Sequence, residues 1–290
     1  MGLRTKFNLV LMLAFSVGLA LAAFLADRIV KQNARDEVIQ NARIMMEGAL
    51  GVRDYTVREI RPLLAMQMKR QFLPQSVSAY AATQNFKALT KKFPDYTYKE
   101  AALNPTNLND RATDWEADII NEFRHNPERD ELITERQTPT GRVLTLAHPL
   151  QIKNEGCLVC HGRVEDAPET MLTDYGSANG FGWKLNETIG AQVVSVPMSL
   201  PLERARQTFI TFMGALLLVF LVIVVLLNIL LQVVVITPVV KMSKIASQVS
   251  MGEQDVPEYV RAGKDEIASL SASFNRMRRS LENAMNMLGE

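Results

Sequence analysis

Residues 209–236 read FITFMGALLLVFLVIVVLLNILLQVVVI, and these 28 residues include no charged side chain. About 20 apolar residues are enough to cross a hydrocarbon core of about 30 Å. A soluble core helix of this length without a single charge is not expected. The stretch therefore predicts a membrane span over residues 208–236. Asn228 and Gln232 lie four residues apart on one face, where they can bond across a helix dimer or sit near the interface.

A second apolar block covers residues 7–26, again without a charge, and its polar members are Asn8 and Ser16. The alternative is a cleaved signal peptide, for which Ala20-Leu21-Ala22 would supply a cleavage site. The block is longer than the apolar region of about 7–15 residues that is typical of such peptides. An uncleaved membrane anchor is therefore favoured.

The basic residues beside the two blocks predict the orientation of the chain. Arg4 and Lys6 precede the first span, and Lys241 and Lys244 follow the second. Short flanks rich in Lys and Arg stay in the cytoplasm. We expect a bacterial inner-membrane protein with both termini inside. Its parts are the N-terminus 1–6, the spans 7–26 and 208–236, a periplasmic domain 27–207 and a cytoplasmic tail 237–290.

Composition excludes several classes of protein. The chain of 290 residues has 32 Lys and Arg against 31 Asp and Glu, for a net charge of +1. Nucleic-acid binders need a basic surface, so that partner is not expected. Only two cysteines and three histidines occur. These counts exclude a disulfide-stapled scaffold, a four-cysteine zinc or iron–sulfur site and most His-rich metal sites.

The periplasmic part is expected to be an α+β domain, PAS-like in outline. Residues 27–57 predict a long signalling helix, because apolar residues recur every three or four positions. Such a stripe can pair with another helix or pack on the chain's own domain. Helices are also predicted over 76–92 and 113–123, and strands over 96–100, 142–148 and 190–196. Helices flanking a small antiparallel sheet give this fold class.

One motif carries chemistry: Cys157-Leu158-Val159-Cys160-His161, a CxxCH sequence. This is the attachment signature of a c-type haem. Two thiols add across the two haem vinyl groups, and the His that follows supplies an axial nitrogen to the iron. One covalent haem c is therefore expected, with Cys157 and Cys160 as attachment residues and His161 as iron ligand. Attachment outside the cytoplasm agrees with the orientation.

Three other interpretations of the motif are a zinc site, a redox pair and a structural disulfide. A zinc site needs four ligands, and the motif holds three. A redox CxxC pair would be expected in a thioredoxin-like βαβ setting, which the sequence does not show. A structural disulfide can form in an oxidising compartment, and His161 would then be incidental.

The sixth iron ligand is not fixed by the sequence. A lone Met is more often a core residue than an iron ligand. A filled sixth position would favour electron exchange or a redox-switched ligand, whereas an empty one would leave the iron open to a diatomic gas. The candidates are His148, His125, Met66 and Met68, and Met171 and Met198 are further candidates.

The tail 237–290 predicts a parallel coiled-coil dimer. After Thr237-Pro238 come a short apolar stripe and a connector over 252–264, and then a heptad-like series. Its members are Ile267, Leu270, Phe274, Met277, Leu281, Met285 and Leu288. The layout resembles a HAMP module, and Asp265-Glu266-Ile267 stands where that family has its DEIG segment, with Ala268 in place of the usual Gly. A generic dimerising coiled coil is the alternative.

The outer domain resembles a family of periplasmic haem-c sensor domains, PAS-like in fold, that includes a cyanobacterial (Tll-type) single-haem protein. The likeness spans most of 50–200. It lies in Arg61-Pro62-Leu63-Leu64, Phe72-Leu73-Pro74-Gln75-Ser76-Val77, Ala79-Tyr80-Ala81-Ala82-Thr83, Tyr96-Thr97-Tyr98-Lys99, Asn104-Pro105-Thr106-Asn107, Asp114-Trp115-Glu116, Thr138-Pro139-Thr140-Gly141 and Gly180-Phe181-Gly182-Trp183-Lys184. The resemblance implies a covalent haem on Cys157, Cys160 and His161. The cyanobacterial relative is thought to use a Cys as second axial ligand; this chain has no third Cys, so that role does not carry over.

The expected function is therefore a homodimeric membrane sensor. It would pass a periplasmic redox or diatomic-gas signal across the bilayer, through the HAMP-like module, to a separate cytoplasmic output protein. The alternative is a membrane-anchored monohaem cytochrome for periplasmic electron transfer, which would leave the HAMP-like tail without a role. An enzyme is not expected, because no nucleophile–base pair is apparent.

Overall fold

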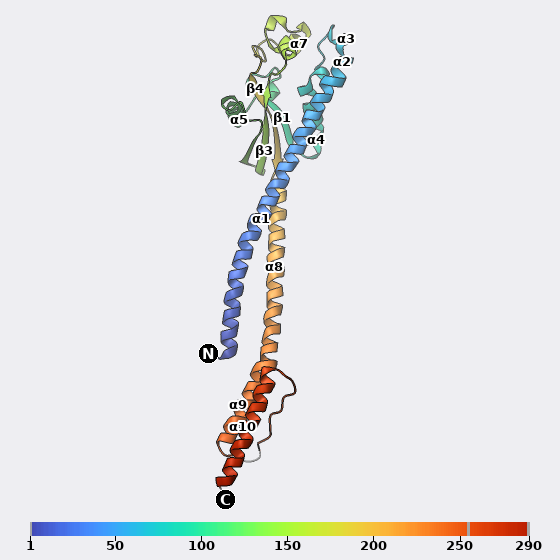
Figure 1. Ribbon diagram of the computed structural model, residues 1–290. Coiled ribbons are helices and arrows are strands. Elements are labelled where there is room, and N and C mark those ends of the chain that lie inside the picture. Colours follow the sequence, from blue (N-terminus) through green and yellow to red (C-terminus); the bar gives the residue numbers. More distant parts are fainter. Residues whose placement is uncertain (1, 254–255, 289–290) are drawn as a thin grey trace. The chain divides into compact units, whose positions relative to one another are not determined.

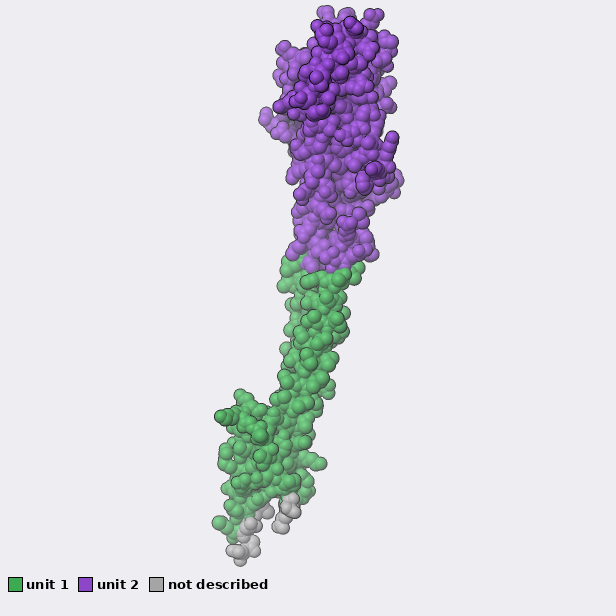
Figure 2. Space-filling view, turned by 90° about the vertical axis from the view of Figure 1, so that its right-hand side faces the viewer, with its two compact units in different colours: residues 1–25, 210–290 green, residues 26–209 purple. Residues whose placement is uncertain are grey.

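The computed structural model describes residues 2–253 and 256–288. That description leaves out residue 1 and residues 289–290, which are the ends of the expected terminal parts. It also leaves out residues 254–255 of the expected connector. The chain divides into two compact units, Ala26–Phe209 and Met1–Leu25 with Ile210–Glu290 (Figure 2).

Helices make up most of the described chain (Figure 1). The α-helices are α1 (Leu3–Tyr55), α2 (Arg61–Leu63), α3 (Ala65–Met68), α4 (Ser78–Lys92), α5 (Asp114–His125), α6 (Leu158–His161), α7 (Glu169–Tyr175), α8 (Ser199–Leu230), α9 (Thr237–Ser250) and α10 (Glu266–Leu288). Short 3₁₀ turns are η2 (Pro74–Ser76), η3 (Leu108–Asp110), η4 (Glu155–Cys157) and η5 (Val164–Asp166), and π-helical turns are η1 (Thr56–Ile60) and η6 (Leu231–Ile236).

The outer unit is built on a four-stranded antiparallel sheet in the order β1-β4-β3-β2. The strands are β1 (Thr97–Ala102), β2 (Leu132–Thr138), β3 (Gly141–Gln151) and β4 (Thr188–Pro197). This confirms the α+β class and the three expected strands. Strand β2 was not expected from the sequence; it is an edge strand that pairs with β3 alone and leaves much of its surface to solvent.

Each face of the sheet is covered by helices (Figure 1). One core cluster joins α1 and α4 to the sheet through Val38, Met46, Phe86, Leu146 and Val194. The other joins α5 to the opposite face through Ile119, Ile120 and Phe123. Thr113 begins α5 with a capping box in which Glu116 reciprocates, as its sequence favours. The sheet is thus held between helices, with α1 as its longest cover.

Helix α1 is longer than the separate span and signalling helix expected from the sequence, because the two are one continuous helix of 53 residues. The stripe that faces the sheet is Ala34, Val38, Ala42, Met46 and Ala49. Met46 is buried in this stripe, and its neighbour Met45 packs partly buried against the same cluster. The helix ends in the π turn η1, which precedes Pro62.

Two helices, Leu3–Leu63 and Ser199–Ser250, are long and apolar enough to cross a membrane by length and composition. Their apolar parts contact each other through Phe15 and Phe220, whose stacked ring centroids lie 3.4 Å apart. The side-chain amides of Asn8 and Asn228 exchange hydrogen bonds of 2.8 and 3.0 Å. Asn228 therefore bonds to the first helix of its own chain, where the sequence had allowed a bond to a second copy.

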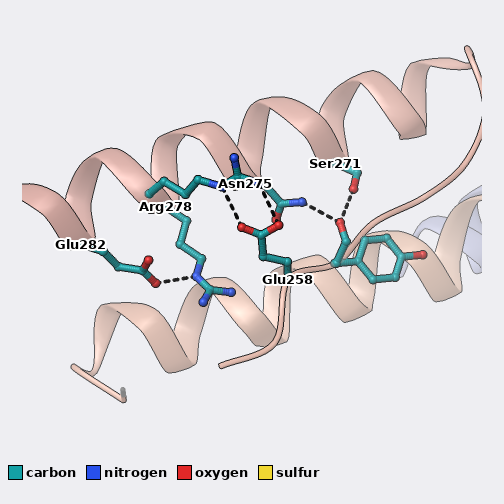
Figure 3. Close-up of polar contacts among 7 residues, drawn as sticks. Glu258, Ser271, Asn275, Arg278 and Glu282 are labelled. Carbon is teal, nitrogen blue, oxygen red and sulfur yellow. Dashed lines mark hydrogen bonds and ion pairs between the residues drawn. The ribbon is translucent and has the colours of Figure 1, made fainter. Parts of the chain in front are cut away.

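The tail forms two neighbouring helices, α9 and α10, and the connector runs back alongside them (Figure 1). The connector is fixed to α10 by polar contacts: Asn275 and Ser271 both donate to the carbonyl of Tyr259, and Arg279 pairs with Glu258 at 2.7 Å (Figure 3). The side of α10 that is buried within the chain holds Ala268, Ser271 and Asn275. The apolar residues Leu270, Met277 and Leu281 remain exposed.

Candidate functional site

The CxxCH motif forms a tight turn directly after strand β3. Cys157 ends the 3₁₀ turn η4, and Leu158, Val159, Cys160 and His161 make the single turn α6. Asn154 starts this turn, because its side chain accepts a hydrogen bond of 2.7 Å from the amide of Gly156. Both cysteines are free and partly buried. The turn displays two thiols and an imidazole from five consecutive residues, while neighbouring apolar side chains support its base.

His161 is oriented by groups far from it in the sequence. Its Nδ1 lies 2.8 Å from the carbonyl oxygen of Gly180 and 3.3 Å from the hydroxyl of Thr106. A carbonyl can only accept, so Nδ1 carries the proton and donates it. The free lone pair is then on Nε2, the atom that binds a metal in this tautomer. Burial lowers the pKa of His161, which keeps the imidazole neutral.

Trp183 packs against the imidazole and completes its support. The two rings are stacked with centroids 4.0 Å apart and an interplanar angle of 16°. The backbone of the same loop pairs with the motif, since Trp183 donates to the carbonyl of His161 at 3.1 Å and Gly182 to that of Gly162 at 2.7 Å. The stacked indole and the hydrogen bond at Nδ1 together hold the imidazole ring in one orientation.

Gly180 makes this close approach possible. Its φ of +82° lies in the left-handed region, and a Cβ built there would lie 2.0 Å from the Thr106 hydroxyl. Its amide also donates to the Asn104 side chain at 3.2 Å. Loop 104–107 and loop 180–184, which carry the family resemblance in the sequence, thus converge on His161. Sequence reasoning found these motifs but could not assign their contact with the histidine.

The thiols and the base of the turn lie in mixed surroundings. Burial raises the pKa of the Cys160 thiol. Cys157 and Leu158 pack with Trp183 against the small cluster of Ile152 and Ile189. Within the described residues, no three His, Cys, Asp or Glu side chains come together as a protein-only metal site requires. Two free thiols beside an apolar cluster, with an imidazole whose Nε2 is free, fit a flat apolar group attached through sulfur and ligated through nitrogen.

A buried polar row crosses the sheet on the face covered by α1. Glu100, Gln192 and His148 are direct neighbours on β1, β4 and β3. Arg53 of α1 pairs with Glu100 in an ion pair that is nearly closed to solvent, and Tyr98 donates to the other oxygen of this carboxylate at 2.8 Å. Burial and the Glu100 charge raise the pKa of Tyr98. Sequence reasoning missed this row, because its members are spread over four elements.

The candidates for a sixth ligand lie in different places. His148 is 3.6 Å from Glu131, which Arg43 also binds, while Nδ1 of His125 lies 2.7 Å from its own helix at Asn121. Met66 is 70% exposed and Met68 is half-buried on α3. The segment after α3 contacts α7, because the Phe72 amide donates to Thr170 at 2.7 Å.

The two remaining methionines are both buried, Met171 in α7 and Met198 in the core between α1 and the sheet. The structure therefore places these candidates on different elements of the outer unit.

Comparison with known proteins gives two family matches. A family model described as Tll0287-like matches residues 31–197, and a HAMP domain model matches residues 234–283. Among solved structures, the chain is similar to one titled "Crystal structure of the cyanobacterial heme-protein Tll0287". That likeness has 15% identity and a TM-score of 0.44, and it covers 56% of this chain and 95% of the other. No curated protein matches the chain.

Proposed function

The chain belongs to the Tll0287-like family and continues into a HAMP domain, and from this premise we propose that it is a membrane-bound sensor with one covalent haem c. A sensor-type domain joined to a HAMP domain is the arrangement of a signal-transducing protein. The observation that carries the haem assignment is the CxxCH turn with His161 held in the Nδ1–H tautomer by Gly180.

The residues of the motif have separate roles in this proposal. Cys157 and Cys160 would hold the group through thioether bonds, and Nε2 of His161 would be its protein nitrogen ligand. Gly180, Thr106 and Trp183 fix the direction of that nitrogen. When bound, the haem would supply a reversible one-electron change or a coordination position for a diatomic gas. This chain would convert such a change at the iron into a shift of the loop that holds His161.

The connectivity of the chain gives that shift a route toward the membrane. Loop 180–184 leads directly into β4, the central strand that pairs with both β1 and β3. Strand β4 ends at Pro197, and the helix α8 begins two residues later at Ser199. Helix α8 continues through η6 into α9, the first helix of the HAMP domain. Small shifts in packed helices are the usual input of two-state signalling elements.

We further propose the setting in which this route works. The chain is a homodimer in the bacterial inner membrane, with both termini in the cytoplasm and the haem domain in the periplasm. The exposed apolar residues Leu270, Met277 and Leu281 of α10 are the surface that a second copy would cover. The stimulus is a redox change or a diatomic gas, and a separate cytoplasmic protein receives the output.

The decisive experiment removes the covalent attachment and observes the cytoplasmic helices. A maleimide spin label at Met277→Cys in the full chain, in lipid nanodiscs, reports the distance between the two copies of α10. We expect the distance distribution to change between oxidised and reduced protein. The change should vanish when both Cys157 and Cys160 are replaced by Ser.

The Ser variant also needs a folding control, which near-ultraviolet circular dichroism of Trp115 and Trp183 provides. A helix response that survives loss of the haem would overturn the proposal, because the input would then lie elsewhere. Rapid electron exchange with soluble cytochromes, without any helix response, would instead identify an electron carrier.

A further inference from the structure

The second apolar helix does not enter the HAMP domain as a regular α-helix. It passes through the π turn η6 and begins α9 at Thr237, with Pro238 in its first turn. Proline has no amide hydrogen, and its ring crowds the carbonyl four residues earlier. That carbonyl belongs to Val234, which therefore cannot receive its α-helical hydrogen bond. Local π adjustments at a proline are one way in which helices accommodate this loss.

The connector supplies a donor to this carbonyl. Nη1 of Arg261 lies 3.1 Å from the Val234 oxygen, and the Arg261 side chain is only 22% exposed. The contact joins residues 27 positions apart. It places a charged donor on the backbone at the point where the helix changes its hydrogen-bond register.

The same guanidinium also binds the start of α10. Its Nη2 lies 3.2 Å from Oδ2 of Asp265. The other carboxylate oxygen of Asp265 accepts from the amide of Ala268 at 2.7 Å, and its carbonyl accepts from Ser269 at 3.0 Å. Asp265 is therefore the N-cap of α10, the role that Asp favours. The Arg261 guanidinium thus contacts both the π turn η6 before α9 and the N-cap residue of α10.

We propose that Arg261 is the positioning residue that couples the end of α8 to the start of α10 within one chain. The covalent path between them runs through α9 and a connector that contains Gly252, Pro257 and Gly263, so it transmits displacement poorly. The guanidinium is a short, rigid bridge with donors on two edges. A shift of the Val234 carbonyl then moves Asp265 and the first turn of α10. This deepens the proposed signalling role, but the bridge itself needs no haem.

A double-mutant cycle tests the bridge in the full chain in nanodiscs, without oxidant or reductant. The readout is hydrogen exchange of the peptide amides over residues 265–270. Arg261→Gln should speed this exchange about tenfold, as expected for the loss of a charged hydrogen bond at a helix end. Pro238→Ala restores an amide donor to Val234 and lets the π turn become regular α-helix, which would draw the Val234 carbonyl into the helix and away from Arg261. It should speed exchange at α10 in the native background and add nothing in the Arg261→Gln background.

Two further variants separate coupling from general stability. Arg261→Lys keeps the charge near Asp265 but cannot hold both acceptors, so the effect of Pro238→Ala should disappear while exchange at 265–270 stays near native. Arg279→Gln breaks the Glu258 pair elsewhere on α10, and its effect should simply add to that of Pro238→Ala. Additive effects of Pro238→Ala and Arg261→Gln would overturn the proposal. Equal coupling to Arg279 would also overturn it, because Pro238→Ala would then be loosening the whole tail.

Discussion

At the scale of single residues, His161 shows how a local motif depends on distant support. Cys157, Cys160 and His161 follow one another in sequence, but the tautomer of the imidazole is set by Gly180 and Thr106. These partners lie 19 and 55 residues away. A hydrogen bond from one ring nitrogen to a carbonyl fixes the orientation of an imidazole and raises the basicity of its other nitrogen. Haem attachment should therefore be sensitive to residues outside the motif.

Gly180→Ala tests this dependence. The new Cβ would overlap the Thr106 hydroxyl and leave the residue at an unfavourable φ, so loop 180–184 must move away from His161. We expect clearly less haem per chain in a haemochrome assay and a weaker axial ligand field in the absorption spectrum.

Gly176→Ala is the matched control for that variant. Gly176 has a similar φ of +78°, but a Cβ there meets no atom within 4 Å. Backbone strain should lower its stability by about 1 kcal/mol, and the variant should retain its haem. Equal haem loss in both variants would contradict a specific role for the Gly180 contact.

Tyr98 gives a pH dependence with a definite sign. Burial, followed by the Glu100 charge, raises its pKa above the ordinary value of 10.0 in the folded protein. The unfolded chain ionises near pH 10 while the folded chain does not, so the free energy of unfolding falls as pH rises above about 10. Because Phe cannot ionise, the destabilisation caused by Tyr98→Phe should shrink between about pH 9 and pH 11. Denaturant unfolding at both values measures it, and an unchanged difference would be the contrary result.

At the scale of elements, α1 is bound to the sheet by ion pairs of different burial. Arg53 pairs with the buried Glu100, whereas Arg35 pairs with the more exposed Glu135 at 2.9 Å. Breaking a buried pair leaves an uncompensated charge, while exposed pairs contribute little. The two pairs lie on one helix and one sheet, so they offer a direct comparison.

Glu100→Gln should therefore lower the free energy of unfolding by about 3 kcal/mol, and the Glu135→Gln control by less than about 1 kcal/mol. Thermal or denaturant unfolding of the full chain, followed by circular dichroism, measures both. Similar small losses would mean that water reaches Arg53 and compensates its charge.

Helix α10 carries two different faces, and this predicts where a second copy binds. The face buried within the chain carries small or polar side chains, such as Ser271 and Asn275. The exposed face carries the apolar residues Leu270, Met277 and Leu281. Leu270→Lys should abolish the dimer in detergent, as judged by mass from light scattering. Ala272→Lys, an exposed position on the same helix, should leave the dimer intact. A dimer that tolerates Leu270→Lys would place the interface elsewhere.

How much the sequence predicts differs from element to element. Periodicity and capping predict the two spans, the helices at 76–92 and 113–123, and three of the strands. Strand β2 did not, because Glu135, Arg136 and Gln137 interrupt its apolar pattern on an exposed edge. The polar row of Glu100, Gln192 and His148 exists only through sheet register, which a single sequence does not specify.

At the scale of the whole molecule, the order of the parts is the main argument for signalling. The haem motif precedes strand β4, then come the helix α8, the π turn η6 and the HAMP domain. The two apolar helices are joined by the Asn8–Asn228 amide pair and the Phe15–Phe220 stack. Hydrogen bonds between apolar helices are worth about 0.6–2 kcal/mol, so the amide pair helps to hold the two helices together.

The central claim is that this chain carries a covalent haem on Cys157 and Cys160. The most direct test is a denaturing haemochrome spectrum, with intact-protein mass, on the full chain expressed together with c-haem maturation proteins. We predict one haem per chain that resists acid extraction and adds its mass to the polypeptide, and none when both cysteines are replaced by Ser. A chain without haem, or one whose haem is extracted by acid, would contradict the account and leave the two thiols to a disulfide.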